Sequence, residues 1–179
     1  MEVVAADVAI AGAGPAGATL AALLSERGIS SVLVERDTFP RDKLCGEFLS
    51  YDALPILEHL GLMETIDREA APRIDVCRVI SGKAAWEFPL PHAARGVTRL
   101  LFDDLLLREA ERRGATVLEG WTATDLDAGG VTISRDDETK RIEAKVVVGA
   151  WGRWGRFDNR LGRAFVRDRS HRHFGFKRH

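Results

Sequence analysis

Residues 7–36 read "DVAIAGAGPAGATLAALLSERGISSVLVER", and no other stretch of the chain says as much about its architecture. Residues 3–11, which overlap the start of this segment, are apolar and β-rich apart from Asp7, as expected of a strand buried on both faces. A glycine-rich turn, a helix over residues 16–27 and a short apolar strand over residues 31–35 follow. The segment therefore predicts a right-handed β-α-β crossover at the beginning of an α/β domain.

The glycine turn has the spacing G-x-G-x-x-G at Gly12, Gly14 and Gly17, with Pro15 where a first helical turn tolerates a missing N–H. The three glycines permit a tight bend, a close approach of backbone to a pyrophosphate, and close packing of helix on strand. The helix N-terminus adds N–H donors and partial positive charge. Glu35 ends the second strand, where a carboxylate accepts hydrogen bonds from a ribose and repels a 2′-phosphate. These residues predict FAD or NAD rather than NADP, and leave the choice between FAD and NAD open.

The remaining sequence continues to alternate strands and helices. Helices are predicted over residues 52–60 and, with an amphipathic leucine pattern, over residues 100–113. Strands are predicted over residues 74–89 (two, around the turn "SGK"), 115–119, 122–127, 131–135, 140–144 and 145–149. We therefore expect an α/β, Rossmann-like domain over residues 1–156, a parallel sheet with helices. Inserted strands fall at about 73–98 and a small antiparallel meander at about 120–144.

Composition excludes several classes of protein. The 179 residues are 45% hydrophobic and 30% charged, as in a globular domain, and no apolar stretch approaches the roughly 20 residues of a membrane span. The N-terminus lacks the basic region of a secretory signal, so a cytoplasmic location is expected. Two cysteines without C-x-x-C spacing predict neither a disulfide framework nor a metal site. The C-terminal residues after Arg153 are basic, but apolar residues interrupt them, so no nucleic-acid partner is expected.

Four segments, taken in order, resemble a known family over nearly the whole chain. They are "IAGAGPAGATLAALLSERG" followed by "VLVER", "FPRDKLCGEFLS", "GVTRLLFDDLLLREAERRGA" and "VVVGAWGRWGR". The family is the N-terminal half of FAD-dependent oxidoreductases of the geranylgeranyl reductase and flavin monooxygenase/halogenase superfamily. The resemblance implies FAD as cofactor and NAD(P)H as electron donor in the complete enzyme. It also implies a small-molecule substrate, lipid-like, polyketide or isoprenoid, which is reduced, hydroxylated or halogenated.

The resemblance also implies cofactor contacts for particular residues. The glycine turn would meet the pyrophosphate, Glu35 the adenosine ribose, and Arg36 its surroundings. The R-x-x-x-C-G segment would lie along the flavin, and the arginine of the G-x-x-R-x-x-x-D segment would reach phosphate or ribityl oxygens. The candidate cofactor-binding residues are Gly12, Gly14, Pro15, Ala16, Gly17, Glu35, Arg36, Cys45, Gly46, Arg99, Ala123 and Gly152.

Alternatives remain for some of these residues. Cys45 is equally suited to be a small buried hydrophobe, and Arg99 to be a solvent-facing arginine at a helix start. Glu47, Asp103 and Asp104 are expected to be structural or solvated. No Ser-His-Asp set, paired carboxylates or metal-ligand cluster is evident, so no catalytic residue is predicted.

The chain departs from the family's pattern in two ways. Trp151 precedes Gly152 where many relatives have an Asp-Gly pair, which puts the docking of NAD(P)H in question, and Trp151 and Trp154 are expected to pack. The chain also ends where the relatives' second half begins, so residues 157–179 are expected to start a missing half. An incomplete gene product, a fragment and one part of a split protein all fit this length. A non-catalytic dinucleotide-binding module that needs a partner chain is the alternative to an enzyme.

Overall fold

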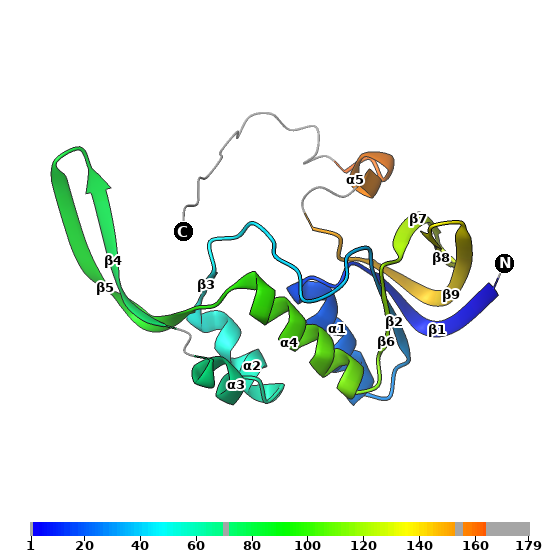
Figure 1. Ribbon diagram of the computed structural model, residues 1–179, viewed down its shortest axis with the longest axis horizontal. Coiled ribbons are helices and arrows are strands. Elements are labelled where there is room, and N and C mark those ends of the chain that lie inside the picture. The colour runs from blue at the N-terminus through cyan, green and yellow to red at the C-terminus, as the bar shows by residue number, and fades with distance from the viewer. Residues whose placement is uncertain (1, 70–71, 153–155, 164–179) are drawn as a thin grey trace. The chain divides into compact units, whose positions relative to one another are not determined.

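The computed structural model describes residues 2–69, 72–152 and 156–163 (Figure 1). These residues form two compact units. The first unit consists of Met1–Thr38 and Ala110–His179, and the second unit of Phe39–Glu109. The predicted boundary near residue 156 borders residues that lie outside the described part of the chain, as does most of the stretch expected to begin a second half.

The first unit is built on a six-stranded mixed sheet. Its elements are β1 (Glu2–Ala11), α1 (Pro15–Glu26), β2 (Ser31–Glu35), β6 (Thr116–Glu119), β7 (Thr122–Asp127), β8 (Gly130–Arg135), β9 (Glu138–Gly149) and α5 (Arg156–Arg160). The strand order is β6-β2-β1-β9-β8-β7. The first four strands run parallel, whereas β8 pairs antiparallel with both β9 and β7. The predicted α/β class and the initial β-α-β unit are confirmed.

Both faces of β2 are covered, since all five of its residues are buried, and its central residues Val32, Leu33 and Val34 are apolar. Because side chains alternate along a strand, Val32 and Val34 share one face. They belong to a cluster formed with the meander strands, whose buried members are Ala9, Val32, Val34, Trp121, Val131, Ile133 and Ile142. The opposite face packs against α1, whose fully buried residues Ala18, Ala21 and Ala22 are small enough to let the helix approach the sheet closely. Figure 1 shows α1 on one side of β2 and the strands β7 to β9 on the other.

Strand β9 differs from the sequence-based prediction of two separate strands over residues 140–144 and 145–149, which was wrong. One continuous strand of 12 residues runs from Glu138 to Gly149. It pairs with β8 up to Glu143, and with β1 from Lys140 to Gly149. No glycine or proline lies near the junction between Ala144 and Lys145, so no turn-forming residue interrupts the extended backbone there. The meander is therefore continuous with the parallel sheet.

The second unit contains a small antiparallel sheet and short helices. Its elements are β3 (Phe48–Leu49), the 3₁₀ turn η1 (Tyr51–Ala53), α2 (Leu54–His59), α3 (Met63–Arg68), β4 (Arg73–Ser81), β5 (Ala84–Gly96) and α4 (Arg99–Arg112), whose last turn belongs to the first unit. The sheet order is β3-β5-β4. The predicted helix over residues 52–60 is divided into η1 and α2, while α3 and β3 were not predicted. None of the helices in the described residues is long and apolar enough to pass through a membrane.

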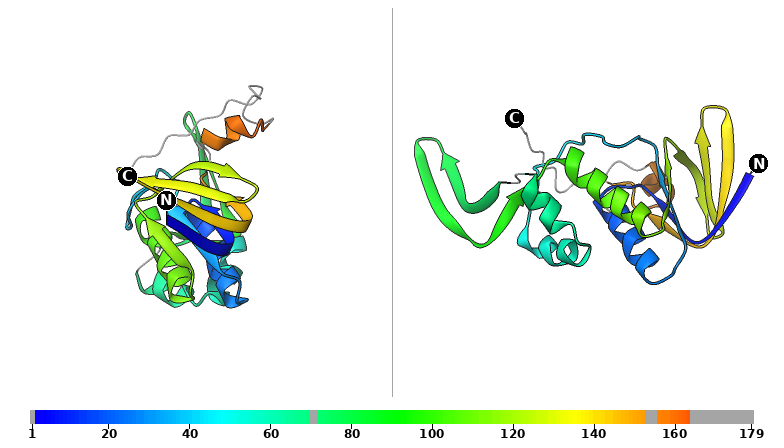
Figure 2. Two further views of the ribbon diagram at one scale, coloured as in Figure 1. Left: turned by 90° about the vertical axis from the view of Figure 1, so that its right-hand side faces the viewer. Right: turned by 60° about the horizontal axis from the view of Figure 1, so that its bottom comes forward.

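The β4–β5 hairpin of the second unit exposes apolar side chains. Val79 pairs with Trp86 and Cys77 with Phe88, so these four side chains lie on one face of the hairpin. Val79, Trp86 and Phe88 are 46%, 56% and 47% exposed. Figure 2 shows the hairpin extending beyond α2 and α3 of the same unit. We call Cys77, Val79, Trp86 and Phe88 the apolar hairpin face.

Candidate cofactor-binding site

The glycine turn connects β1 to α1 and is packed too tightly for any side chain at two of its positions. Gly12 has φ +110°, and a Cβ there would lie 2.4 Å from the carbonyl oxygen of Ala150. A Cβ at Gly17 would lie 1.9 Å from the carbonyl oxygen of Gly12. Both contacts are with backbone, which cannot rotate away as a side chain can. Glycine at these positions is therefore required by the close packing of β1, α1 and the end of β9.

The backbone N–H groups of this turn divide into two sets. Gly12 N–H donates to the Val34 carbonyl at 2.8 Å, which ties the turn to β2. Helical hydrogen bonding begins with Ala18 N–H, which donates to the Gly14 carbonyl at 3.0 Å. The N–H groups of Ala16 and Gly17 precede it in the first turn, where a helix leaves its donors for a cap or a ligand. Together with the helix dipole they make this end of α1 suited to an anion.

Glu35 joins the end of β2 to the glycine turn. Its side chain is nearly buried, at 8% exposure, and Oε2 accepts a hydrogen bond of 2.9 Å from Ala13 N–H. Oε1 accepts a second hydrogen bond, of 3.2 Å, from Asp37 N–H. The carboxylate is thus fixed beside the first turn of α1. Arg36 differs, because its side chain is 71% exposed and pairs with Asp37 at the surface, at 3.6 Å from Nε to Oδ1.

The segment after β9 forms the other wall of the glycine turn. Ala150 N–H donates to the Ala11 carbonyl at 2.8 Å. The Trp151 ring lies over Gly149, where an added Cβ would be 2.3 Å from the ring, and its centroid is 5.1 Å from that of Phe157. Trp151 therefore packs, as predicted, while Trp154 lies outside the described residues. Gly152 follows with φ +79°.

Strand β7 begins next to Glu35. Trp121 N–H donates to the Glu35 carbonyl at 2.9 Å, and Ala123 lies two residues further on, half-buried and paired with Ile133 of β8. The first unit thus brings the predicted residues of the glycine turn together with Glu35. Strand β7, which carries Ala123, begins beside Glu35 and runs from there into the meander.

The other three candidates belong to the second unit. Cys45 and Gly46 lie in the loop of residues 38–47, which has no helix or strand, and Arg99 is the first residue of α4. Arg99 lies close enough to Cys45 for the cysteine side chain to contribute to the rise in the pKa of Arg99. The Arg99 side chain is only 15% exposed, so the alternative of a solvent-facing arginine is wrong. A Cβ at Gly46 would meet nothing within 4 Å, so packing does not demand glycine there.

Of the two alternatives expected for Asp103, structural or solvated, the structure supports the first, and the sequence-based prediction assigned no role to its partner Arg41. Asp103 is fully buried, rather than solvated, and its carboxylate accepts hydrogen bonds from Arg99 and from Arg41. Hydrogen bonding to Asp103 raises the pKa of Arg99, with a smaller contribution from Cys45 and with burial opposing the rise. The signal was present in the sequence, since Arg41 opens the R-x-x-x-C-G segment and Asp103 closes the G-x-x-R-x-x-x-D segment.

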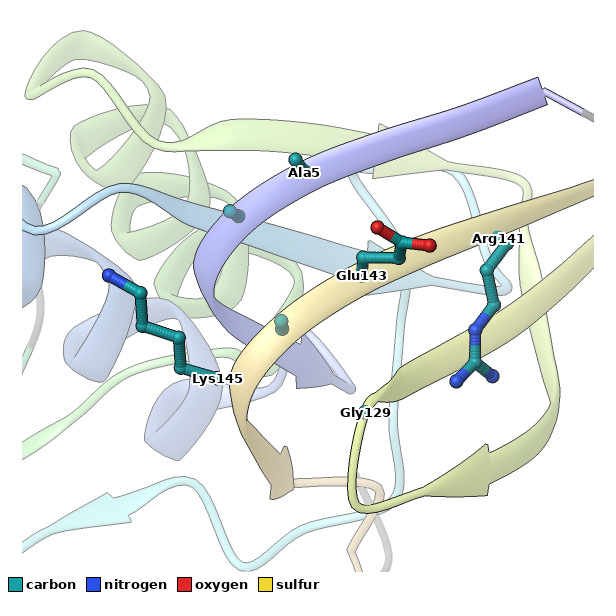
Figure 3. Close-up of a pocket in the computed structure, with 7 residues that line it drawn as sticks. Ala5, Gly129, Arg141, Glu143 and Lys145 are labelled. Carbon is teal, nitrogen blue, oxygen red and sulfur yellow. The ribbon is translucent and has the colours of Figure 1, made fainter.

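A surface hollow of about 520 Å³ lies elsewhere on the first unit (Figure 3). It is lined by Ala5, Ala6, Gly129, Arg141, Glu143, Ala144 and Lys145. Two of its charges are already paired, Arg141 with Asp127 and Lys145 with Asp7, each at 2.6 Å. Lys145 and Ser30 together lower the pKa of Asp7 to about 2. The hollow contains none of the residues predicted to bind the cofactor.

Comparison with known proteins establishes the family. The chain matches the family model described as "FAD binding domain" over residues 5–176, and it belongs to this family of FAD-binding domains. A 1H-pyrrole-2-carbonyl-[peptidyl-carrier protein] brominase of Pseudoalteromonas luteoviolacea is 32% identical, over 82% of this chain and 37% of its own length. The menaquinone reductase of Mycobacterium tuberculosis is 31% identical, over 91% of this chain and 41% of its own length.

Solved structures agree with this assignment. The flavin-dependent halogenase CmlS superposes with a TM-score of 0.79 at 34% identity, covering 88% of this chain and 31% of that one. A geranylgeranyl bacteriochlorophyll reductase-like protein of Thermoplasma acidophilum shares the fold at 24% identity, with a TM-score of 0.71 over 84% of this chain and 40% of that one. The predicted resemblance to the FAD-dependent oxidoreductase and halogenase superfamily is confirmed. The chain spans 37% to 41% of the length of the two curated relatives named above.

Proposed function

We propose that this chain binds FAD and forms the cofactor-binding part of an FAD-dependent oxidoreductase. The observation that carries the proposal is the hydrogen bond from Ala13 N–H to Glu35 Oε2, at 2.9 Å. It fixes a carboxylate of the kind that accepts hydrogen bonds from a ribose next to a helix N-terminus whose first N–H groups are suited to a pyrophosphate. Both parts of an adenine dinucleotide are thereby matched within one unit.

The residues fit the cofactor in shape and in charge. Glycine at positions 12 and 17 keeps the turn free of side chains, and the N–H groups of Ala16 and Gly17 would hold the pyrophosphate. Glu35 would hold the ribose, and Arg99 with Cys45 would contact the phosphate, ribityl or flavin portion. The bound flavin supplies electron and hydride transfer, while the protein orients it.

We further propose that the complete enzyme uses NAD(P)H and acts on an apolar small molecule. The apolar hairpin face supports this substrate class, because exposed aromatic and aliphatic side chains on one face are typical of surfaces that contact apolar ligands. The relatives named as a menaquinone reductase and a pyrrole brominase give the same indication. Reduction, hydroxylation and halogenation all remain compatible with this site.

The test is a titration of the purified chain with FAD, NAD⁺ and NADP⁺, followed by the absorbance of bound flavin and an assay of NADPH oxidation. Saturable FAD uptake, with much weaker binding of NADP⁺, is the expected result. FAD uptake without NADPH oxidation would instead favour a binding module that needs a partner chain, an alternative consistent with its 37% to 41% coverage of those relatives. Failure to take up FAD would refute the proposal.

A further inference from the structure

Asp103 is the centre of a buried charge cluster in the second unit. Its side chain is completely buried on α4. Arg99 donates to it through two nitrogens, from Nε to Oδ1 at 2.5 Å and from Nη2 to Oδ2 at 2.6 Å. Arg41 donates from Nη1 to Oδ2 at 2.9 Å, and its side chain is 9% exposed. One carboxylate therefore binds two guanidinium groups away from water.

The two-nitrogen contact fixes the orientation of the Arg99 guanidinium. A bidentate pair holds the plane of the guanidinium as well as its position, which a single hydrogen bond does not do. Because the carboxylate binds the edge formed by Nε and Nη2, the opposite edge, which carries Nη1, points away from Asp103. The Cys45 side chain lies near the same guanidinium and contributes to the rise in its pKa. Two candidate cofactor contacts are thus arranged around one carboxylate.

Arg41 links the irregular loop of residues 38–47 to α4 through the same carboxylate. The backbone of this loop forms neither helix nor strand, and Leu44 within it is 83% exposed. The Arg41 guanidinium also lies over the Phe39 ring, 4.7 Å from its centroid. Cys45 follows Arg41 by four residues in this loop.

We propose that Asp103 is a positioning residue for flavin binding, which orients the Arg99 guanidinium and anchors the loop that carries Cys45. The inference rests on the proposed function, since it requires that the chain binds FAD. Asp103 itself would contact no cofactor atom. It would act through Arg99, a candidate cofactor contact, and through Arg41, whose loop carries the candidate Cys45. A buried charge is costly unless it is paired, and Asp103 is paired with both guanidinium groups, whose positions it thereby fixes.

The neighbouring Asp104 provides a matched control. It lies on the same helix and pairs with Arg108 at the same i, i+4 spacing, at 3.2 Å. Its side chain is 31% exposed, and the pair is therefore weakened by solvent. Asp103→Asn and Asp104→Asn make the same chemical change one residue apart, and only the first disturbs the cluster.

The experiment compares the full 179-residue chain with Asp103→Asn and Asp104→Asn. Three readouts are needed: FAD affinity by fluorescence titration, visible circular dichroism of the bound flavin, and the thermal midpoint without FAD. We expect Asp103→Asn to weaken FAD binding at least tenfold and to change the flavin dichroism, and Asp104→Asn to change affinity less than twofold. In an Arg99→Gln background, the further effect of Asp103→Asn should shrink to threefold or less, because the residue it orients has gone.

The possible results of these measurements separate a failure of the positioning role of Asp103 from a failure of the proposed function. An unchanged affinity in Asp103→Asn, with FAD uptake by the unaltered chain intact, overturns the inference and leaves the proposed function standing. An equal loss with and without Arg99 means that Asp103 acts on folding alone, which also overturns it. If Asp103→Asn fails to fold, Arg99→Lys keeps the charge but loses the two-nitrogen contact, and wild-type affinity in that variant is the refuting result. Absence of FAD uptake by the unaltered chain overturns the proposed function, and the inference with it.

Discussion

Replacing Gly17 by alanine should weaken both the fold and flavin binding, although alanine is the better helix former. In the interior of a helix, glycine to alanine usually gains about 0.5–1 kcal/mol. Here the new Cβ would lie 1.9 Å from the Gly12 carbonyl oxygen and 3.2 Å from the Ala150 Cβ. An ordinary carbon-to-oxygen contact needs about 3.3 Å, so the turn and the helix would have to separate by more than 1 Å.

The size of the effect follows from these two opposing contributions. Overpacking of this kind costs about 1–3 kcal/mol, so a net loss of about 1–2 kcal/mol in the free energy of unfolding is expected. Movement of the turn also displaces the N–H groups of Ala16 and Gly17. A hydrogen bond to a charged group contributes about 1.5–3 kcal/mol, so losing one weakens FAD binding about 10- to 150-fold.

Urea denaturation and FAD titration measure the two effects separately. Gly28→Asn is the control, because Gly28 has φ +69° with nothing within 4 Å of its Cβ position, and asparagine tolerates this conformation. The control should change stability by less than about 1 kcal/mol and leave FAD affinity unchanged. A Gly17→Ala chain that is more stable than the wild type and binds FAD equally well would refute the packing argument.

Three further predictions test other parts of the structure. Glu35→Gln should weaken FAD binding about tenfold by titration, since the ribose loses a charged acceptor, and undiminished affinity would remove Glu35 from the site. The pKa of Asp7 is lowered from 3.8 to about 2, chiefly by Lys145 and then by Ser30, so its contribution to stability is present above pH 3.8 and lost as pH falls toward 2. Asp7→Asn should therefore flatten the decline of the urea midpoint over that range, and an unchanged decline would contradict this assignment. Trp121→Ala removes a ring that is 3% exposed and whose centroid lies 4.6 Å from the Arg135 guanidinium carbon. Urea denaturation should show that the free energy of unfolding falls by about 3–5 kcal/mol, whereas a fall below about 1 kcal/mol would show that the cluster repacks.

The parts of the fold that the sequence predicted are those governed by local patterns. The spacing of Gly12, Gly14 and Gly17 has a physical reason within a dozen residues, and α1 begins and ends within a residue or so of its predicted bounds. The same holds for α4 and the meander strands, where amphipathic or alternating patterns are strong. Helix α3 escaped prediction because only Ile66 among its six residues is buried, so no periodic apolar pattern marks it.

The site was less predictable because its geometry depends on residues distant in sequence. The carboxylate of Asp103 contacts Arg41, 62 positions earlier, and no local pattern reveals that the pair is buried. Glu35 was assigned correctly to the end of a strand, but its hydrogen bond to Ala13 arises from the folded turn. The motifs proposed which residues bind the cofactor, whereas the contacts between these residues are seen only in the folded structure.

The continuity of β9 restricts where residues can be inserted or deleted during evolution. Removing one residue between Ile142 and Gly149 would either turn Ile142 out of the cluster it shares with β8 or shift the backbone of Ala150 that closes around Gly12, depending on which side of the deletion moves. A single deletion in this strand would therefore disturb the meander or the glycine turn. Gaps and insertions among homologous sequences should therefore collect in the two reversals at residues 128–129 and 136–137, and spare the span from Glu138 to Gly149.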